Sequence, residues 1–207
     1  MATGIPIAVG ELIDTTTINT WARGYLRKTT AKTVASTTGA NDLLNGEFVL
    51  PAGAMGTDKI VRLSAWGDFK NDSGAPRDVP TFRLILGSTT LLDTNNTGTA
   101  VVFNTPTRNQ WKITAEIQNL GAANSQFARL TGRMNYAPGA SSFAAGAWTT
   151  GTGVTFADGQ VIVSYDGGHA GLAVDTTASC NLKLNVLNAF SDANYETKLY
   201  GALCEVI

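Results

Sequence analysis

The stretch that decides the fold is IVRLSAWGDFKNDSGAPRDVPTFRLILGSTTLLDT, which runs from Ile60 to Thr94. Apolar and polar residues alternate near its start, over residues 60–66, and again over residues 81–86. Period-two alternation of this kind predicts strands with one buried face. Gly87-Ser88 predicts a tight turn before a short returning strand. The stretch therefore predicts a strand, a polar loop, a second strand, a turn and a third strand.

The alternation in the first of these strands also predicts which side chains are buried. Val61, Leu63 and Ala65 are expected on one face, and Arg62, Ser64 and Trp66 on the other. Other segments with strand character are 46–53, 89–93, 100–104, 109–118, 126–136, 160–165, 173–176, 180–188 and 195–207. The glycine-rich segment between the strand 160–165 and the strand 173–176 is expected to be a turn.

These segments give about eight main strands and no interior helix, the number needed for two four-stranded sheets. The uneven spacing of the strands favours an all-β jelly-roll β-sandwich. A length of 207 residues suits one such domain. We place this domain at residues 41–207, after an extended N-terminal arm of residues 1–40.

The composition limits the classes of partner and reaction. The chain has one histidine, two cysteines, 15% charged residues and a formal net charge of −1. Without a block of like charges, neither a nucleic acid nor an anionic membrane surface is an expected partner. No apolar run reaches the roughly 18 residues of a membrane span. The opening MATGIPIAVGELID lacks the basic and apolar regions of a signal peptide, so we expect synthesis in a cytoplasm.

Reactive residues are few, and none stands in a catalytic motif. His169 lies in DGGHAG without cysteine or histidine partners at the spacing of a zinc site. Aspartates beside glycines are ordinary turn residues, and no D-x-D-x-D-G loop is present. The sequence also lacks a G-x-S-x-G elbow and a phosphate-binding loop. We therefore expect no enzymatic activity, no cofactor and no metal.

The two cysteines, Cys180 and Cys204, fall in the last two expected strands. A disulfide is geometrically possible if those strands are neighbours. The alternative is two small, buried apolar side chains.

The N-terminal 40 residues contain the most basic segment of the chain. An arm that joins apolar anchors to positive charge, and that cannot bury itself, usually docks on a partner. The expected docking residues are Trp21, Arg23, Tyr25, Leu26, Arg27 and Lys28. The alternative is a first strand or loop that packs on its own domain.

Three segments resemble a widespread group of bacteriophage and prophage virion proteins. They are VRLSAWGDFKNDSGAPRDVPTFRLILGSTTLLDT, TRNQWKITAEIQN and AVDTTASCNLKLNVLNA. The resemblance covers roughly residues 46–190 and consists of turn and packing motifs. It implies a jelly-roll sandwich on a phage particle, usually as a trimer. Proteins of the group decorate capsids or belong to fibres and tails.

Two sets of residues are candidates for contact surfaces. Phe143 and Trp148 are the only large side chains of a loop rich in small residues, at 138–153. They could contact a partner protein or a glycan, or fold back onto the domain. Phe127, Arg129 and Arg133 share one face of a strand and are expected at the oligomer interface. Trp66 and Tyr165 are further candidates for stacking on a sugar, whereas Trp111, which was weighed with them, is expected in the core.

The sequence thus favours a non-enzymatic virion protein, a capsid decoration or cement protein that stabilises the head as a homotrimer. The expected partners are further copies of the chain and the major capsid protein. An arm that clamps several capsid subunits would make each later contact effectively intramolecular. The alternative is a receptor- or glycan-binding module of a fibre or tail.

Overall fold

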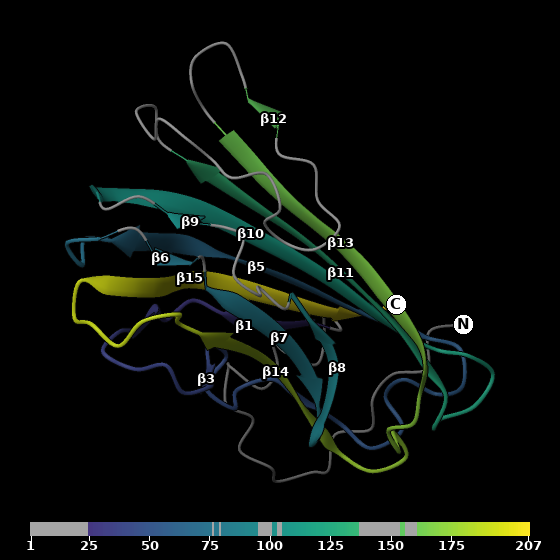
Figure 1. Ribbon diagram of the computed structural model, residues 1–207. Coiled ribbons are helices and arrows are strands. Elements are labelled where there is room, and N and C mark those ends of the chain that lie inside the picture. Colours follow the sequence, from purple (N-terminus) through teal and green to yellow (C-terminus); the bar gives the residue numbers. More distant parts are fainter. Residues whose placement is uncertain are drawn as a thin grey trace, which may run out of the picture.

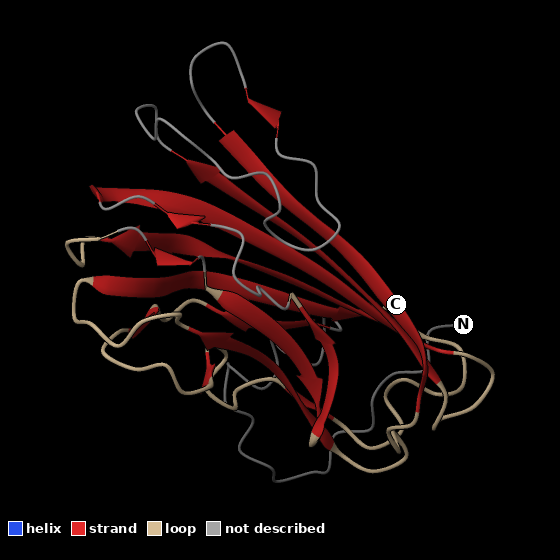
Figure 2. Ribbon diagram, viewed as in Figure 1, coloured by secondary structure: helices blue, strands red, loops and turns tan. Residues whose placement is uncertain are grey.

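The computed structural model describes residues 25–75, 77–78, 80–94, 101–102, 105–136, 154–155 and 161–207. Figure 1 shows two curved β-sheets that face each other, and Figure 2 shows that the described residues contain strands and loops but no helix. Within these residues there is accordingly no helix that could span a membrane. The predicted all-β sandwich is confirmed, whereas its jelly-roll connectivity stays a prediction.

Among the described strands, every neighbouring pair is antiparallel. The larger sheet has the order β1 (Tyr25–Lys28), β15 (Tyr195–Val206), β5 (Ile60–Asn71), β10 (Thr105–Asn119), β11 (Gln126–Tyr136), β13 (Val161–Leu172) and β12 (Val154–Thr155), with β2 (Lys32–Val34) also on β15. The second sheet has the order β3 (Asn41–Asp42), β14 (Cys180–Leu187), β7 (Thr81–Leu86) and β8 (Thr89–Asp93), with β4 (Val49–Leu50) also on β14. A short pair, β6 (Arg77–Asp78) with β9 (Val101–Val102), lies outside both sheets.

Eight of the described strands have at least five residues, as the alternation predicted. They divide five to three between the sheets, so the expected division of four to four is wrong. The reason is the pairing of neighbouring long strands: a short turn joins β10 to β11, and β11 pairs with β13 along its whole length. These connections keep three consecutive long strands in one sheet.

Two expectations about strand ends are also wrong. β13 continues through the glycine-rich segment to Leu172, because each residue from Val161 to Ala170 has a partner on β11. Cross-strand pairing therefore overrides the turn that the glycines predicted, and residues 173–176 are not a strand. The expected strand 46–53 shrinks to β4, because Gly46 and Gly53 adopt φ values of 71° and 69° and turn the chain at both ends.

The core lies between the two sheets and is rich in aromatic residues. Trp111 of β10 is 2% exposed and meets Phe82 of the opposite sheet, with ring centroids 4.9 Å apart. Phe69 and Tyr195 make an edge-to-face pair at the same distance. The indole nitrogen of Trp111 donates a hydrogen bond of 2.9 Å to the carbonyl of Asp68, which satisfies its only polar group. The prediction that Trp111 is a core residue is confirmed.

Residues 25–40 belong to the sandwich, which corrects the expected boundary after residue 40. β1 pairs with β15 from Tyr25 to Lys28, and β2 pairs with the same strand. Leu26 packs against the core, and the Lys28 side chain is 2% exposed, in an ion pair with Glu47. These residues therefore form a first strand that packs on its own domain, which is the alternative to a docking arm. Trp21 and Arg23, also expected in the arm, lie outside the described residues.

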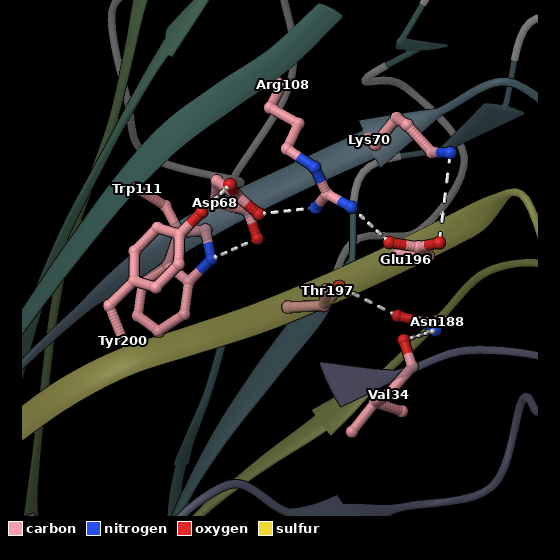
Figure 3. A network of polar contacts seen from close by, with 9 residues as sticks. All are labelled: Val34, Asp68, Lys70, Arg108, Trp111, Asn188, Glu196, Thr197 and Tyr200. Carbon is pink, nitrogen blue, oxygen red and sulfur yellow. Dashed lines mark hydrogen bonds and ion pairs between the residues drawn. The ribbon is translucent and has the colours of Figure 1, made fainter. Parts of the chain in front are cut away.

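A polar contact between the sheets holds β2 in place. Asn188 donates a hydrogen bond of 3.1 Å to the carbonyl of Val34. The hydroxyl of Thr197 on β15 donates to the Asn188 carbonyl oxygen at 2.8 Å (Figure 3). All three residues are buried, and the two hydrogen bonds give the Asn188 amide, the Val34 carbonyl and the Thr197 hydroxyl partners inside the protein.

The two cysteines are free and buried, one in each sheet. Burial raises the pKa of the Cys204 thiol to about 12, so it stays protonated at neutral pH. The interpretation as small apolar side chains is therefore correct.

Gly67 of β5 sits where the neighbouring strands of the same sheet, β15 and β10, leave no room for a side chain. A Cβ atom at this position would lie 1.8 Å from the carbonyl oxygen of Lys198 and 2.7 Å from a ring carbon of Trp111. Backbone and a buried indole cannot move aside cheaply. We expect Gly67→Ala to lower the free energy of unfolding by about 3 kcal/mol or more.

Chemical denaturation monitored by tryptophan fluorescence measures this loss. Gly39→Ala is the matched control, because its Cβ would meet only the Thr37 hydroxyl at 3.4 Å on an exposed turn. Equal stability of the two variants would contradict the close approach of β5 and β15.

Candidate functional site

The outer face of the larger sheet carries rows of side chains in register. Trp66 of β5 lies opposite Lys112 of β10, which lies opposite Arg133 of β11. A second row joins Arg62, Glu116 and Arg129 in the same way. Arg62 and Glu116 form an ion pair of 2.9 Å, whereas the first row combines an aromatic ring with two cations. The first row is therefore the more unusual surface.

Trp66 is an exposed ring on a rigid support. It is 42% exposed, and its partner across the strand pair is Gly201 of β15. A Cβ atom on residue 201 would lie 2.6 Å from a carbon of the indole. The ring can therefore rest against the backbone only because residue 201 is glycine. This contact limits ring motion on one side and leaves part of the indole open to solvent.

Tyr200 is the second exposed ring, and an irregularity of β15 presents it. The register against β5 shifts between Leu199 and Gly201, so Tyr200 is an extra residue in a β-bulge. It is 42% exposed, and its hydroxyl donates a hydrogen bond to Asp68. The ammonium group of Lys198 lies 5.1 Å from the ring centroid, within cation–π range. Two contacts thus hold this ring in one orientation.

The carboxylate that anchors Tyr200 belongs to a charge network (Figure 3). The Asp68 side chain is 5% exposed and accepts a hydrogen bond of 2.7 Å from Arg108. Arg108 also pairs with Glu196, whose other oxygen lies 3.8 Å from the Lys70 ammonium group. Two acids thus face two bases. The network neutralises itself and contributes little net charge to the surface beside it.

The two rings and the first row border a groove of about 480 Å³. The outer groove, as we call it, is lined by Trp66, Gly67, Gln110, Trp111, Lys112, Arg133 and Tyr200. Its volume lies in the range of small-ligand sites, about 300–1,000 Å³. Lys112 and Arg133 form no ion pair with any side chain that the structure describes. The groove therefore combines flat apolar surfaces, an amide and two available positive charges.

Such a lining is suited to binding. Aromatic rings stack on flat apolar faces, the Gln110 amide can donate and accept hydrogen bonds, and a guanidinium group can bind a carboxylate through two parallel hydrogen bonds. Among the described residues, no three histidine, cysteine, aspartate or glutamate side chains gather where they could hold a metal ion.

The structure brings together some of the residues that the sequence singled out. Phe127, Arg129 and Arg133 share the outer face of β11, and Arg133 also lines the groove. Their role at an oligomer interface stays a prediction. Phe143 and Trp148 lie outside the described residues, and His169 falls within β13.

The sequence offered Trp66 as a candidate for sugar stacking, but it did not predict Tyr200 or the pairing of the two rings. The alternation of β5 did place Trp66 outward, but nothing local indicated that residues 66 and 200 meet. Their neighbours carried a signal: Trp66-Gly67 and Tyr200-Gly201 are both aromatic–glycine pairs, and the two pairs lie side by side. Exposed aromatic residues beside glycines in strands indicate close packing between backbone and ring.

No protein-family model matches the chain, and no curated protein matches it either.

The hydrogen bond between Tyr200 and Asp68 gives a pH-dependent prediction. This bond is the main cause that raises the pKa of Tyr200 above its ordinary value of 10.0, and burial adds to it. The unfolded chain therefore loses this proton at a lower pH than the folded protein. The contribution of this hydrogen bond to the free energy of unfolding is fully present below pH 10. It is lost as the pH rises through the pKa of Tyr200 in the folded protein.

We expect the wild-type protein to lose more stability above pH 10 than Tyr200→Phe, as measured by urea denaturation at pH 8 to 11. The ultraviolet absorbance of ionised tyrosine should show one late-titrating group that is missing in the variant. Identical pH profiles for the two proteins would exclude the bond.

Proposed function

We propose that the chain is a non-enzymatic structural protein of a bacteriophage virion, a capsid decoration protein that stabilises the head as a homotrimer. Three segments that resemble phage virion proteins support this, together with the β-sandwich fold. The observation that carries the proposal is the way in which the start of the described chain is fixed to the larger sheet.

The chain enters the sandwich at β1, and several contacts hold it there. Four residues of β1 and three of β2 pair with β15, which itself pairs with β5 in the middle of the sheet. The buried Lys28 ammonium group pairs with Glu47. A partner bound to residues 1–24 would therefore be joined to the rigid sandwich and not to a loose end. A clamp needs this firm connection.

The preceding segment has the residues that such a clamp requires. Trp21 supplies an aromatic anchor and Arg23 a positive charge. Arg27 adds an exposed positive charge on β1. In a trimer, three such segments would hold neighbouring capsid subunits, and each segment that binds would raise the effective concentration of the next. Aromatic anchors would provide most of the affinity, and the charges would orient the encounter.

Deletion of residues 1–24 tests the docking role of the segment. The truncated protein should keep its thermal unfolding midpoint, because β1 and β2 remain. It should lose binding to particles of the phage that encodes it, measured by co-sedimentation. Full occupancy by the truncated protein would contradict the proposal.

A longer deletion, of residues 1–40, provides a contrast. It removes β1 and β2, takes away the Lys28 partner of Glu47 and leaves one edge of β15 unpaired. We expect lower stability and a tendency to aggregate through that edge. The shorter deletion therefore separates loss of docking from loss of folding.

The trimer is tested separately. Light scattering coupled to size-exclusion chromatography should give three times the mass of one chain. A monomer at all concentrations, in solution and on the particle, would contradict it.

A second function is favoured by the outer groove, namely a glycan-binding module of a fibre or tail. Copy number in purified virions distinguishes the two locations, because decoration proteins are far more abundant in a particle than fibre proteins.

A further inference from the structure

We infer that the outer groove is a saccharide site, and that the sugar unit bound there carries a carboxylate. This goes beyond the head-binding role, because it uses a different part of the molecule. The docking segment lies before β1, whereas the groove lies over β15, β5, β10 and β11.

The two aromatic rings have a shape and a fixed position that suit a sugar. A sugar ring has a flat face of C–H groups and a rim of hydroxyl groups, so it can stack on an aromatic ring while its rim stays hydrogen bonded. The Trp66 indole is supported by Gly201 and is 42% exposed. Because the support exists before a ligand arrives, little conformational entropy is lost when the sugar stacks.

Tyr200 offers its ring as the second apolar wall. Its hydroxyl donates to Asp68 and its ring interacts with Lys198, so its orientation is set within the protein. Gln110 in the lining provides an amide donor and an amide acceptor for ring hydroxyl groups. Flat apolar walls with a few directed polar groups are what a saccharide of one or a few units requires.

The groove also carries positive charge. Lys112 and Arg133 are neighbours across β10 and β11 and have no ion pair in the described part of the chain. The nearby acids, Asp68 and Glu196, are already paired with Arg108 and Lys70. The groove is therefore locally positive in a chain whose net charge is −1. A carboxylate on the sugar would pair with these two cations.

Single-stranded nucleic acid would also stack on aromatic rings, but it needs a basic track along several nucleotides. Here the available positive charge is limited to Lys112, Arg133 and the Lys198 ammonium group at the Tyr200 ring. The row on the other side alternates in sign through Arg62, Glu116 and Arg129. A sugar acid fits this confined charge better than a polyanion does.

The experiment is a glycan array that contains uronic acid and sialic acid oligosaccharides, each beside its neutral counterpart. The full-length protein should bind one or more acidic saccharides and bind the neutral counterpart at least about tenfold more weakly. Isothermal titration with trigalacturonate, sialyllactose and lactose then measures the affinity of representative probes, together with any array ligand.

Three variants relate binding to the groove. Trp66→Ala should weaken binding of the acidic saccharide by about tenfold or more, because the stacking surface is lost. Lys112→Gln combined with Arg133→Gln should abolish the preference for the acid while leaving the neutral sugar unaffected. Gly201→Ala should weaken binding without altering a groove-lining residue, because its Cβ displaces the indole.

Arg62→Gln is the matched control, since it removes one positive charge from the same face of β5 outside the groove. It should leave binding unchanged. Circular dichroism and thermal unfolding of every variant show whether the fold is retained.

Several results would overturn the inference. They are the absence of binding to any acidic saccharide, equal binding by Trp66→Ala, or binding only to an acidic peptide or an oligonucleotide through the same residues. Failure here and failure of the docking proposal are separable. Trp66→Ala should still decorate particles, and the protein without residues 1–24 should still bind the saccharide.

Discussion

Two glycines set how closely β5 and β15 approach each other. Gly67 lets the Lys198 carbonyl and the Trp111 ring occupy the space where a side chain would stand. Gly201 lets the Trp66 ring rest on the backbone on the outer face. One strand pair is thereby tight on both sides. The core packing of Trp111 and the exposed surface of Trp66 both depend on this contact.

The same strand pair joins the inside of the protein to its surface chemistry. The bulge at Tyr200 shifts the register, and the Tyr200 hydroxyl reaches the buried carboxylate of Asp68. Because Arg108, Glu196 and Lys70 balance that charge within the network, it does not neutralise Lys112 and Arg133. The surface can therefore stay positive beside two acids. The β-bulge at Tyr200 thus orients one wall of the groove.

Sequence patterns predicted the parts of the fold that depend on local alternation. The β-sandwich, the inward Trp111 and the outward Trp66 follow from period-two patterns that each strand carries by itself. The patterns failed where a distant partner decided the outcome. Pairing with β11 kept the glycines of β13 in a strand, and pairing with β15 drew β1 and β2 into the sheet. The groove was missed for the same reason, since Trp66 and Tyr200 are far apart in the chain.

The place of β15 between β1 and β5 has a consequence for the order in which the chain can fold. During synthesis, β1 and β2 emerge first but have no partner until residues 195–206 have been made. The β10–β11 hairpin can form early, because its strands are close in sequence. The larger sheet can be completed on the other side of β5 only after β15 has been made. β1 and β2 therefore stay without their strand partner through most of translation, and the nascent chain has to be protected from aggregation during that time.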